Sequence, residues 1–273
     1  MKAIVKDKFV LLLCGGRGSR MGDYTTSIPK PLLNVHGKPI LWYTFWTLYN
    51  QGFRNYILPL GYQGGKIKKY VSKISEGLDC KILFKNTGVD TSIAERINLV
   101  KDMIPENSDF FMLNSDTLFD FDIKEMYLTH LTNKALVTLS SVEVVSSWGL
   151  MFLKDDKLVG FDRERKVRHF VSNDFSDNIY GLVYSGFVWI NKSALEHVDL
   201  IKCQDFEQSL YQRIIEISKS ANYQIRGLWY PIDTPKDLKV VNLNIHDKHN
   251  MGNSAKEFKE KLALLETNHN AIT

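Results

Sequence analysis

The chain has 273 residues, of which 44% are hydrophobic and 24% are charged, and its formal net charge at pH 7 is +4. These proportions are typical of an ordinary globular protein, and the length suits one large domain with a full core. The basic residues are spread along the chain, so no nucleic acid and no membrane surface is expected as a partner. Three cysteines without paired spacing indicate neither a disulfide framework nor a zinc site, and favour a reducing cytoplasm: Cys14, Cys80 and Cys203.

The apolar run at residues 9–13 predicts a buried strand that ends in a glycine-rich loop, Cys14-Gly15-Gly16-Arg17-Gly18-Ser19-Arg20-Met21. Glycine lets successive N–H groups face one concavity, and Arg17, Arg20 and Lys30 place cations within reach of it. The pattern predicts a phosphate site. The alternative is a plain strand-to-loop turn with solvated basic residues.

Two other glycine loops do not fit this stretch. A Walker loop ends in Gly-Lys-Ser/Thr, whereas Gly18 is followed here by Ser19 and Arg20. A dinucleotide fingerprint requires a third small residue where Met21 stands and an acid about twenty residues further on, where the chain reads Pro39-Ile40-Leu41-Trp42.

Strand and helix patterns then alternate along the first half. Strands are expected at residues 56–60, 81–84 and 109–116, and helices at 39–52, 64–74 and 93–103. This alternation predicts a parallel sheet with helices on both faces and a ligand beyond the carboxyl ends of the strands.

The second half is richer in strands. They are expected at residues 137–145, 149–153, 158–161, 180–190 and 224–230, with a hairpin turn at 154–157 and helices at 209–218 and from Pro235 onward. Beyond His246 the chain is polar and partly helical in pattern. We therefore expect one domain over residues 1–245 and a polar, partly helical tail over 246–273.

Two aspartates follow apolar runs and are placed at the rim of the sheet. Asp116 follows the run 110–113, and Asp233 follows residues 228–232. Taken alone, each is typical of a turn or a helix cap. Next to a triphosphate, the pair would be oxygen ligands for Mg²⁺.

The glycine loop followed by Pro29-Lys30-Pro31 resembles the signature of the nucleotidylyltransferases that join a nucleoside triphosphate to a sugar 1-phosphate. The similarity to glucose-1-phosphate cytidylyltransferases extends over most of residues 9–245. It includes Trp229-Tyr230-Pro231-Ile232-Asp233-Thr234, where that family has Trp-x-Pro-Met-Asp-Thr. It also includes Gly37-Lys38-Pro39-Ile40-Leu41-Trp42, Gly61-Tyr62-Gln63-Gly64, Asn86-Thr87-Gly88 and Asp205-Phe206-Glu207.

The resemblance implies a Rossmann-like α/β fold, a mostly parallel mixed sheet flanked by helices, which is the GT-A-like nucleotidyltransferase fold. It implies a CTP-dependent cytidylyltransferase that transfers CMP to a small phosphorylated acceptor, by default a sugar 1-phosphate, and releases pyrophosphate. Mg²⁺ would be the cofactor, and the enzyme would be a cytoplasmic homo-oligomer of polysaccharide or capsule biosynthesis. An anionic acceptor oxygen would attack the α-phosphorus, so the protein's work would be positioning and charge neutralisation.

The resemblance also assigns site residues. Catalytic roles fall on Arg20, Lys30, Asp116 and Asp233, the two aspartates being the metal ligands. Nucleotide binding falls on Leu13, Cys14, Gly15, Gly16, Arg17, Gly18, Ser19, Thr87, Gly88, Arg96 and Ser115. Acceptor binding falls on Trp148, Gly149, Gly186 and Glu207. In place of the family's lysine, the acceptor phosphate would be held by one of Arg163, Arg165 and Lys166, and the sequence leaves open which of them does so.

Three segments depart from the cytidylyltransferase pattern. Ile93-Ala94-Glu95-Arg96 replaces Thr-Gly-Gly-Arg, so Glu95 is expected either to point outward or to accept a hydrogen bond from the cytosine amino group. Phe161-Asp162-Arg163-Glu164-Arg165-Lys166 replaces a segment with Glu-Lys-Pro, and Tyr184-Ser185-Gly186 replaces Asn-Gly-Gly. The acceptor therefore stays open, and a small non-sugar phosphate or phosphoramidate is an alternative.

Two other classes of function are kept. A nucleotide-sugar glycosyltransferase is encouraged by Asp120-Phe121-Asp122, which resembles the metal motif of that class, although the basic loop speaks against it. A non-catalytic nucleotide-binding regulator would be expected to have lost a metal aspartate, and both are present.

Overall fold

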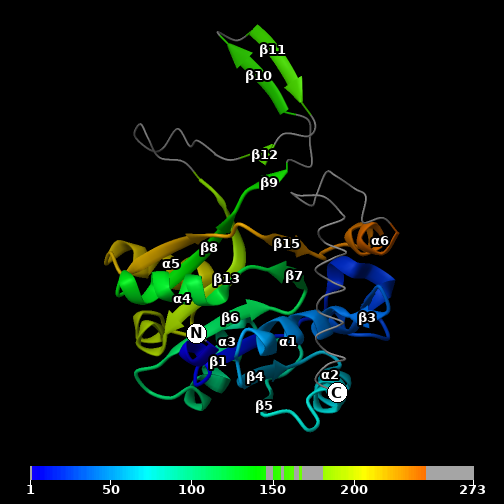
Figure 1. Cartoon of the computed structure of the whole chain (residues 1–273), viewed down its shortest axis with the longest axis vertical. Coiled ribbons are helices and arrows are strands. Elements are labelled where there is room, and N and C mark those ends of the chain that lie inside the picture. Colours follow the sequence, from blue (N-terminus) through cyan, green and yellow to red (C-terminus); the bar gives the residue numbers. More distant parts are fainter. Residues whose placement is uncertain (1, 146–149, 155–156, 163–165, 168–180, 244–273) are drawn as a thin grey trace.

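The computed structural model of the chain describes residues 2–145, 150–154, 157–162, 166–167 and 181–243. A seven-stranded sheet forms its centre, with the strand order β14-β8-β13-β6-β1-β4-β5 (Figure 1). These strands are β1 (Phe9–Leu13), β4 (Asn55–Leu60), β5 (Lys81–Asn86), β6 (Asp109–Asn114), β8 (Val137–Val142), β13 (Val183–Asn191) and β14 (Ser220–Gln224).

Four small strand pairs surround this sheet. They are β2 (Asn34–Val35) with β3 (Lys38–Pro39), β7 (Thr117–Asp120) with β15 (Leu228–Pro231), β9 (Val144–Val145) with β12 (Lys166–Val167), and β10 (Leu150–Lys154) with β11 (Lys157–Asp162).

The α-helices are α1 (Ile40–Asn50), α2 (Gly64–Ile74), α3 (Ile93–Val100), α4 (Ile123–Thr132), α5 (Phe206–Glu216) and α6 (Pro235–Leu243). Short 3₁₀ helices occupy Lys2–Val5, Ser19–Thr25, Lys30–Leu32, Lys101–Met103 and Lys192–His197.

The expected mostly parallel mixed sheet is confirmed. β1 is parallel to β4 and β6, β4 is parallel to β5, and β8 is parallel to β14. Only β13 within this sheet is reversed, and it pairs antiparallel with β6 and β8. The carboxyl ends of β1, β4, β5 and β6 therefore meet at one edge, where the loops that follow them can share a ligand.

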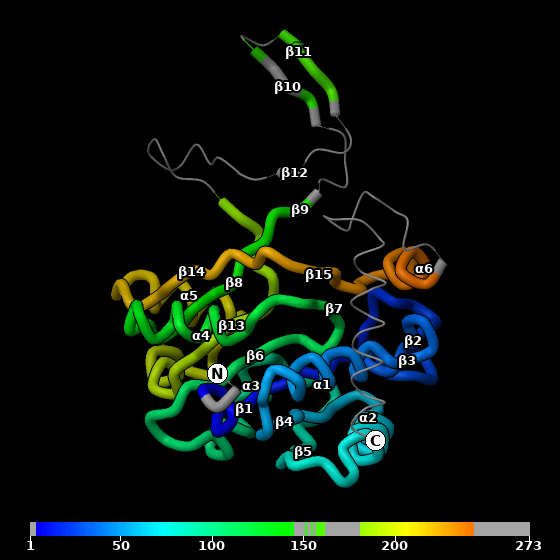
Figure 2. Tube along the Cα trace, in the orientation of Figure 1, coloured from blue at the N-terminus to red at the C-terminus, as the bar shows by residue number. Residues whose placement is uncertain are grey.

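β1 is apolar at every position because both of its faces are buried. Val10 and Leu12 belong to the core under α1, α2 and α4, and Phe9 and Leu11 belong to the core under α3 and α5. Helices thus cover both faces, as the alternating pattern predicts (Figure 2).

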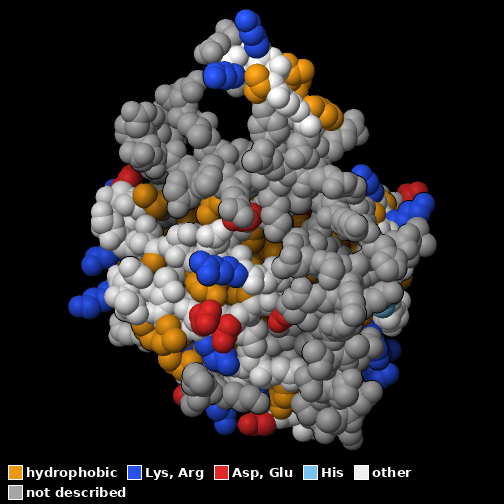
Figure 3. Space-filling view, turned by 45° about the horizontal axis from the view of Figure 1, so that its top comes forward, with side chains coloured by type: hydrophobic (Ala, Val, Ile, Leu, Met, Phe, Trp, Pro, Cys, Tyr) orange, Lys and Arg blue, Asp and Glu red, His pale blue; other side chains and the backbone are white. Residues whose placement is uncertain are grey.

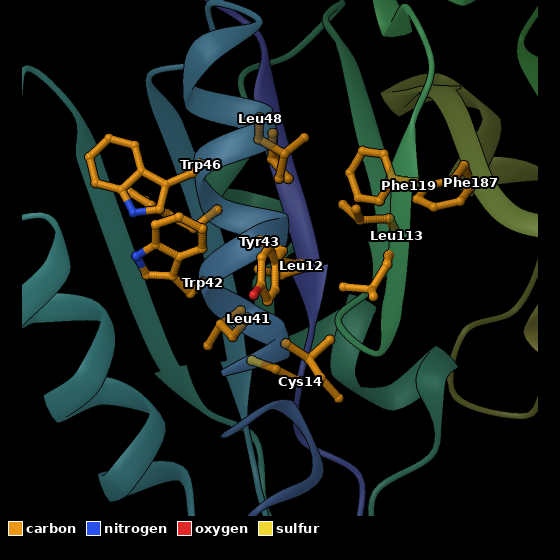
Figure 4. Close-up of a cluster of buried hydrophobic side chains, with 14 of the residues drawn as sticks. Leu12, Cys14, Leu41, Trp42, Tyr43, Trp46, Leu48, Leu113, Phe119 and Phe187 are labelled. Carbon is orange, nitrogen blue, oxygen red and sulfur yellow. The ribbon is translucent and has the colours of Figure 1, made fainter. Parts of the chain in front are cut away.

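α1 is mostly apolar, and residues 40–48 are all buried, including Thr44 and Thr47. A helix with this pattern needs neighbours on every side. One side packs against the main sheet, where Figure 4 shows Tyr43 and Leu41 beside Leu12 and Cys14. Another side contacts β7, which continues from the end of β6. α1 therefore links the sheet to the β7–β15 pair.

The single strand expected at residues 224–230 is wrong. Gln224 ends the pairing of β14 with β8, and Leu228 begins the pairing of β15 with β7. Gly227 lies at the crossing, where a Cβ atom would stand 2.1 Å from the backbone oxygen of Asp120. This close approach requires glycine. The helix expected at 209–218 also begins earlier, at Phe206, because the Asp205 side chain accepts from the backbone N–H of Gln208 and caps it.

The predicted hairpin in the second half is confirmed as β10 and β11. Its apolar side chains are largely exposed, with fractions between 59% and 67% for Met151, Leu158, Val159 and Phe161. Figure 3 shows apolar and basic side chains of this hairpin at the top of the view. Within the described part of the chain, no helix is long and apolar enough to cross a membrane.

A polar cluster is buried at the opposite end of the sheet from the glycine loop, around Asp109. Tyr127 Oη and Asn191 Nδ2 donate to its two carboxylate oxygens at 2.7 and 2.8 Å. His130 Nε2 lies 3.4 Å from Oδ1, and Lys8 Nζ lies 3.5 Å from Oδ2. Burial by itself raises the pKa of Asp109, but the hydrogen bonds from His130, Tyr127 and Asn191 outweigh it and hold the pKa well below its usual value.

Asp109→Asn is expected to lower the free energy of unfolding by about 2 kcal/mol or more at neutral pH, because it leaves buried donors without a charged acceptor. Since the pKa is depressed in the folded state, this stabilisation is complete above the unfolded pKa of about 4 and is lost as the pH falls toward the folded value. Urea unfolding of wild type and Asp109→Asn at neutral and acidic pH measures the difference in their free energies of unfolding. This difference should become smaller in acid.

Asp79→Asn is the matched control for that measurement. The Asp79 carboxylate is 82% exposed and lies 3.7 Å from Lys6, so its loss should change stability little at any pH. A stability difference between wild type and Asp109→Asn that stayed constant into acid would contradict the role given to Asp109.

Candidate active site

The glycine loop begins where β1 ends, and it contacts the connections that follow β4 and β5. Tyr62 N–H donates to Gly15 O at 3.0 Å. A Cβ on Gly15 would lie 2.0 Å from Arg96 Nη1, and a Cβ on Gly61 would lie 2.4 Å from Gly15 O and 2.6 Å from Gly88 O. Three chain segments therefore meet here at distances that only glycine allows.

Arg96 is buried at this junction, with 5% of its surface exposed. Its Nη1 donates to Thr87 Oγ1 at 2.8 Å and its Nη2 donates to Val89 O at 3.2 Å. The hydroxyl of Thr87 in turn donates to Leu60 O at 2.9 Å. The guanidinium thus holds the β5–α3 connection in place, and both Thr87 and Arg96 lie beside the glycine loop as expected for a nucleotide site.

Cys14 does not offer a nucleophile. Its side chain is buried, and burial raises the pKa of the thiol to about 12, although the Arg96 charge acts in the opposite direction. The group is therefore a neutral thiol at physiological pH.

Ser115 also has its side chain engaged. Its hydroxyl donates to Leu13 O at 2.8 Å, and its backbone N–H donates to the same oxygen at 3.2 Å. The residue joins the ends of β1 and β6, and its side chain is buried. It lies at the predicted site, but its hydroxyl binds the backbone of the protein.

Arg17 forms an ion pair across the mouth of the loop. Its Nε and Nη2 donate to the two oxygens of Asp90 at 2.8 and 3.1 Å, and its guanidinium lies 5.6 Å from the centre of the Tyr62 ring. Both partners are exposed. Asp90 has no motif around it in the sequence, so the sequence did not predict this pair.

The two predicted metal aspartates come together because β7 and β15 are paired. Thr117 stands opposite Pro231 in this antiparallel pair, and Ile232 N–H donates to Asp116 O at 2.9 Å. Asp116 and Asp233 flank the paired residues on neighbouring strands. The pairing of two short strands from distant parts of the chain thus builds the carboxylate pair.

Lys30 lies between these carboxylates. Its Nζ donates to Asp116 Oδ2 at 2.6 Å and to Asp233 Oδ1 at 2.9 Å. Its side chain is only 9% exposed. Arg20 Nη2 lies 3.3 Å from the same Asp233 oxygen but is 72% exposed. All four predicted catalytic residues therefore lie together.

Asp237, which sequence reasoning missed, orients Asp233. Its Oδ2 accepts from the N–H groups of Asp233 and Thr234 at 3.1 and 2.7 Å, while Asp237 N–H donates to Thr234 Oγ1 at 3.3 Å. This is a capping box at the start of α6. The signal was present as Thr234-Pro235-Lys236-Asp237, a hydroxyl residue with an acid three positions later.

The carboxylate pair fits a divalent metal ion. Oxygens from two segments already converge on one cation, the Lys30 ammonium. Among the described residues, no group of three or more His, Cys, Asp or Glu side chains could hold a metal. A metal at Asp116 and Asp233 would thus complete its shell with water and phosphate oxygens, which is how Mg²⁺ binds. The Mg²⁺ assignment stays a prediction.

The acceptor side is described in part. Gly186 has a positive φ of +87°, and a Cβ there would lie 3.4 Å from Asn114 Nδ2 at the end of β6. Glu207 contacts Tyr184, two residues before Gly186; burial raises the pKa of Glu207, and the Asp205 charge acts in the same direction. Trp229 Nε1 donates to Ser185 O at 2.8 Å and ties β15 to this segment. Trp148, Gly149, Arg163, Arg165 and the side chain of Lys166 lie outside the described residues.

A three-layer α/β fold with a basic glycine loop and a carboxylate pair at the carboxyl ends of its strands defines a class of enzymes that act on nucleoside phosphates. The sequence profile of the family described as "Nucleotidyl transferase" matches residues 9–248. The chain belongs to this family and is a nucleotidyltransferase.

Two curated proteins illustrate the family. The chain is 30% identical over 251 residues to a probable glucose-1-phosphate cytidylyltransferase of Bacillus subtilis, covering 85% of this chain and 94% of that one. It is 27% identical over 231 residues to the catalytic subunit beta of mannose-1-phosphate guanylyltransferase of Drosophila melanogaster, covering 84% of this chain and 60% of that one. The names of these two relatives thus refer to the transfer of different nucleotides, cytidylyl in one case and guanylyl in the other.

A solved structure agrees with the fold. HddC from Yersinia pseudotuberculosis, complexed with GMP-PN, superposes with a TM-score of 0.60 at 22% identity, covering 86% of this chain and 97% of that one.

Proposed function

We propose that this protein is a CTP-dependent cytidylyltransferase that joins CMP to a phosphorylated acceptor, by default a sugar 1-phosphate, and releases pyrophosphate. The observation that carries the proposal is the meeting of Lys30, Asp116 and Asp233 beside the glycine loop. Cations for a triphosphate and carboxylates for a metal ion are thereby in one place. The cytidylyl choice is supported by the relative in Bacillus subtilis and by the Trp229–Thr234 motif.

Each group has a defined task in this proposal. The backbone N–H groups of the glycine loop, with Arg20 and Lys30, hold the triphosphate and neutralise the departing pyrophosphate. Asp116 and Asp233 hold Mg²⁺, which when bound supplies positive charge at the reacting phosphates. The acceptor phosphate is already anionic at neutral pH, so no strong general base is required.

The glycosyltransferase alternative is weakened by the geometry of Asp120-Phe121-Asp122. Asp122 accepts from Lys124 N–H at 2.9 Å and serves as the N-cap of α4. Asp120 pairs with Leu228 in the β7–β15 ladder. Asp122 is therefore engaged in capping a helix, while Asp116 and Asp233 converge on one cation.

Turnover with CTP, UTP, ATP and GTP tests the nucleotide choice, with a panel of sugar 1-phosphates, smaller phosphates and phosphoramidate as acceptors and pyrophosphate release as the readout. We expect CTP to exceed UTP by about tenfold or more, because one mismatched buried polar group costs about 1–3 kcal/mol. Equal use of CTP and UTP would overturn the cytidylyl assignment and leave the transferase class intact.

Glu95→Gln is the informative variant for this assay. Glu95 is exposed and its Oε2 accepts from Ser92 N–H at 2.7 Å, so that the two residues form the capping box of α3. Of the two expectations for this side chain, its exposure and its place in the cap favour the outward orientation. The variant should therefore keep the wild-type ratio of CTP to UTP turnover. A fall in this ratio would mean that Glu95 contacts the base.

A further inference from the structure

The Lys30 ammonium occupies the space between the two carboxylates that the proposed metal ion needs. It lies 2.6 Å from Asp116 Oδ2 and 2.9 Å from Asp233 Oδ1, and the side chain is almost fully buried. Both contacts are charge-assisted hydrogen bonds, which are stronger than neutral ones. No other lysine or arginine in the described part of the chain contacts both aspartates.

We propose that Lys30 is an internal counter-ion that keeps divalent metal out of the nucleotide-free site, so that metal and triphosphate bind together. This inference rests on the proposed function for its ligands. It assigns to Lys30 a role in the free protein, before any phosphate is bound, in addition to its role in neutralising phosphate.

The first argument is electrostatic. A metal ion on Asp116 and Asp233 would use the same oxygens that now accept from the ammonium, and two cations at such short separation repel strongly in a partly buried site. Lys30 must therefore leave before the metal can enter. Because no third His, Cys, Asp or Glu side chain of the described residues joins these two carboxylates as a possible ligand, the metal gains little without the oxygens of a triphosphate.

The second argument is geometric. The stem of Lys30 packs on the glycine loop: a Cβ on Gly18 would lie 3.0 Å from Lys30 Cβ and 3.5 Å from Cδ. The backbone is fixed nearby, since Leu33 N–H donates to Lys30 O at 3.1 Å. Lysine carries its charge on a flexible four-carbon stem. The ammonium can thus turn from the aspartates toward a phosphate on the loop while the backbone stays in place.

The third argument is that the other loop cations are also paired. Arg17 binds Asp90, and Arg20 contacts Asp233. In the nucleotide-free site, the basic side chains of the loop are therefore neutralised by carboxylates of the protein itself. When a metal–triphosphate complex binds, the phosphates replace the carboxylates as partners of the basic side chains. The metal ion replaces the basic side chains as the partner of Asp116 and Asp233. Such coupling is reciprocal, so each ligand raises the affinity of the site for the other.

The test is Mn²⁺ binding to the full chain without nucleotide, measured from the electron paramagnetic resonance signal of free Mn²⁺. Wild type should bind weakly, and Lys30→Met should bind about tenfold more tightly or better, because it frees two carboxylates from a charged hydrogen-bond donor. Lys30→Arg keeps the charge and should stay weak. Lys30→Met combined with Asp116→Asn should lose the gain, which locates the ion.

A matched control is Lys8→Met. Lys8 also lies near a partly buried aspartate, with Nζ 3.5 Å from Asp109 Oδ2, but at the other end of the sheet. Its loss should leave Mn²⁺ affinity unchanged. A second readout is thermal: Mn²⁺ should raise the Tm of Lys30→Met more than that of wild type, since a ligand stabilises the state that binds it. Lys30→Gln serves in the same assays if the methionine variant does not fold.

The proposal is overturned if the neutral variants bind Mn²⁺ no more tightly than wild type, or if Lys30→Arg binds as tightly as they do. Neither result depends on turnover. If Lys30→Met gains affinity while no triphosphate supports pyrophosphate release, the counter-ion role stands and the proposed function fails. If CTP is used but the affinity does not change, the function stands and the counter-ion role fails.

Discussion

Asp116→Asn and Asp233→Asn are each expected to lower kcat for pyrophosphate release by about a hundredfold or more at saturating Mg²⁺. Each change removes an anionic oxygen that lies within hydrogen-bonding distance of the Lys30 ammonium, while the size of the side chain stays nearly the same. The fold should survive, because Lys30 keeps one carboxylate partner in either variant. Initial rates with CTP and the best acceptor measure the loss, and thermal unfolding checks the fold.

Asp122→Asn is the matched control. Asp122 belongs to the other acidic motif, Asp120-Phe121-Asp122, and caps α4 through Lys124 N–H. Asparagine caps a helix about as well as aspartate, so both stability and turnover should be kept. If Asp116→Asn and Asp233→Asn both retain more than about a tenth of the activity, the metal assignment is wrong. Loss of activity in Asp122→Asn alone would move the metal to the other motif.

The sequence was sufficient for the sheet and for the place of the glycine loop because both depend on local patterns. A continuous apolar run such as residues 9–13 must be buried on both faces, and the glycines after it mark the end of the strand. Rim positions for Asp116 and Asp233 followed from the apolar runs before them. The resemblance then placed Lys30 and Arg20 with these aspartates, and the structure brings all four together.

The pairing that builds the carboxylate pair could not be predicted. β7 and β15 are four residues long each, and β7 comes from the middle of the chain whereas β15 comes from its C-terminal part. The pattern of residues 224–230 predicts one strand that runs through Gly227, and the structure divides it there. The requirement for glycine there comes from the backbone of Asp120, which is distant in sequence.

The ion pairs that the charged residues form could not be predicted from the sequence either. The sequence places Arg17 near a phosphate, but its pairing with Asp90 follows from tertiary contacts alone. The resemblance puts Lys30 at one site with Asp116 and Asp233, but it does not indicate that its ammonium contacts both carboxylates. Two further features also follow from tertiary contacts: Arg96 is buried, and the Ser115 hydroxyl donates to Leu13 O. Motifs report which residue types gather at a site, and packing decides which atoms remain available there.

Gly61→Ala is expected to have the second large effect. A Cβ at this position would lie 2.4 Å from Gly15 O, 2.6 Å from Gly88 O and 2.7 Å from Arg96 Nη1. Two of these atoms belong to the backbone and cannot turn away, so the glycine loop and the β5–α3 connection must separate. Overpacking of this kind costs about 1–3 kcal/mol or more. The same separation should raise the KM for the triphosphate, because both loops belong to the proposed nucleotide site.

Gly65→Ala is the control for this change, because it adds the same methyl group away from the place where the glycine loop, Gly61 and Gly88 meet. Gly65 lies four residues away in α2, and a Cβ there has no atom within 4 Å. Alanine in a helix is favoured over glycine by about 0.5–1 kcal/mol, so this variant should be as stable as wild type or slightly more stable. Urea unfolding and triphosphate saturation curves of both variants measure the contrast. If Gly61→Ala had the same stability and the same KM as Gly65→Ala, the three segments could move apart without a loss of free energy of unfolding. Contact among the glycine loop, Gly61 and Gly88 would then not be what shapes the proposed nucleotide site.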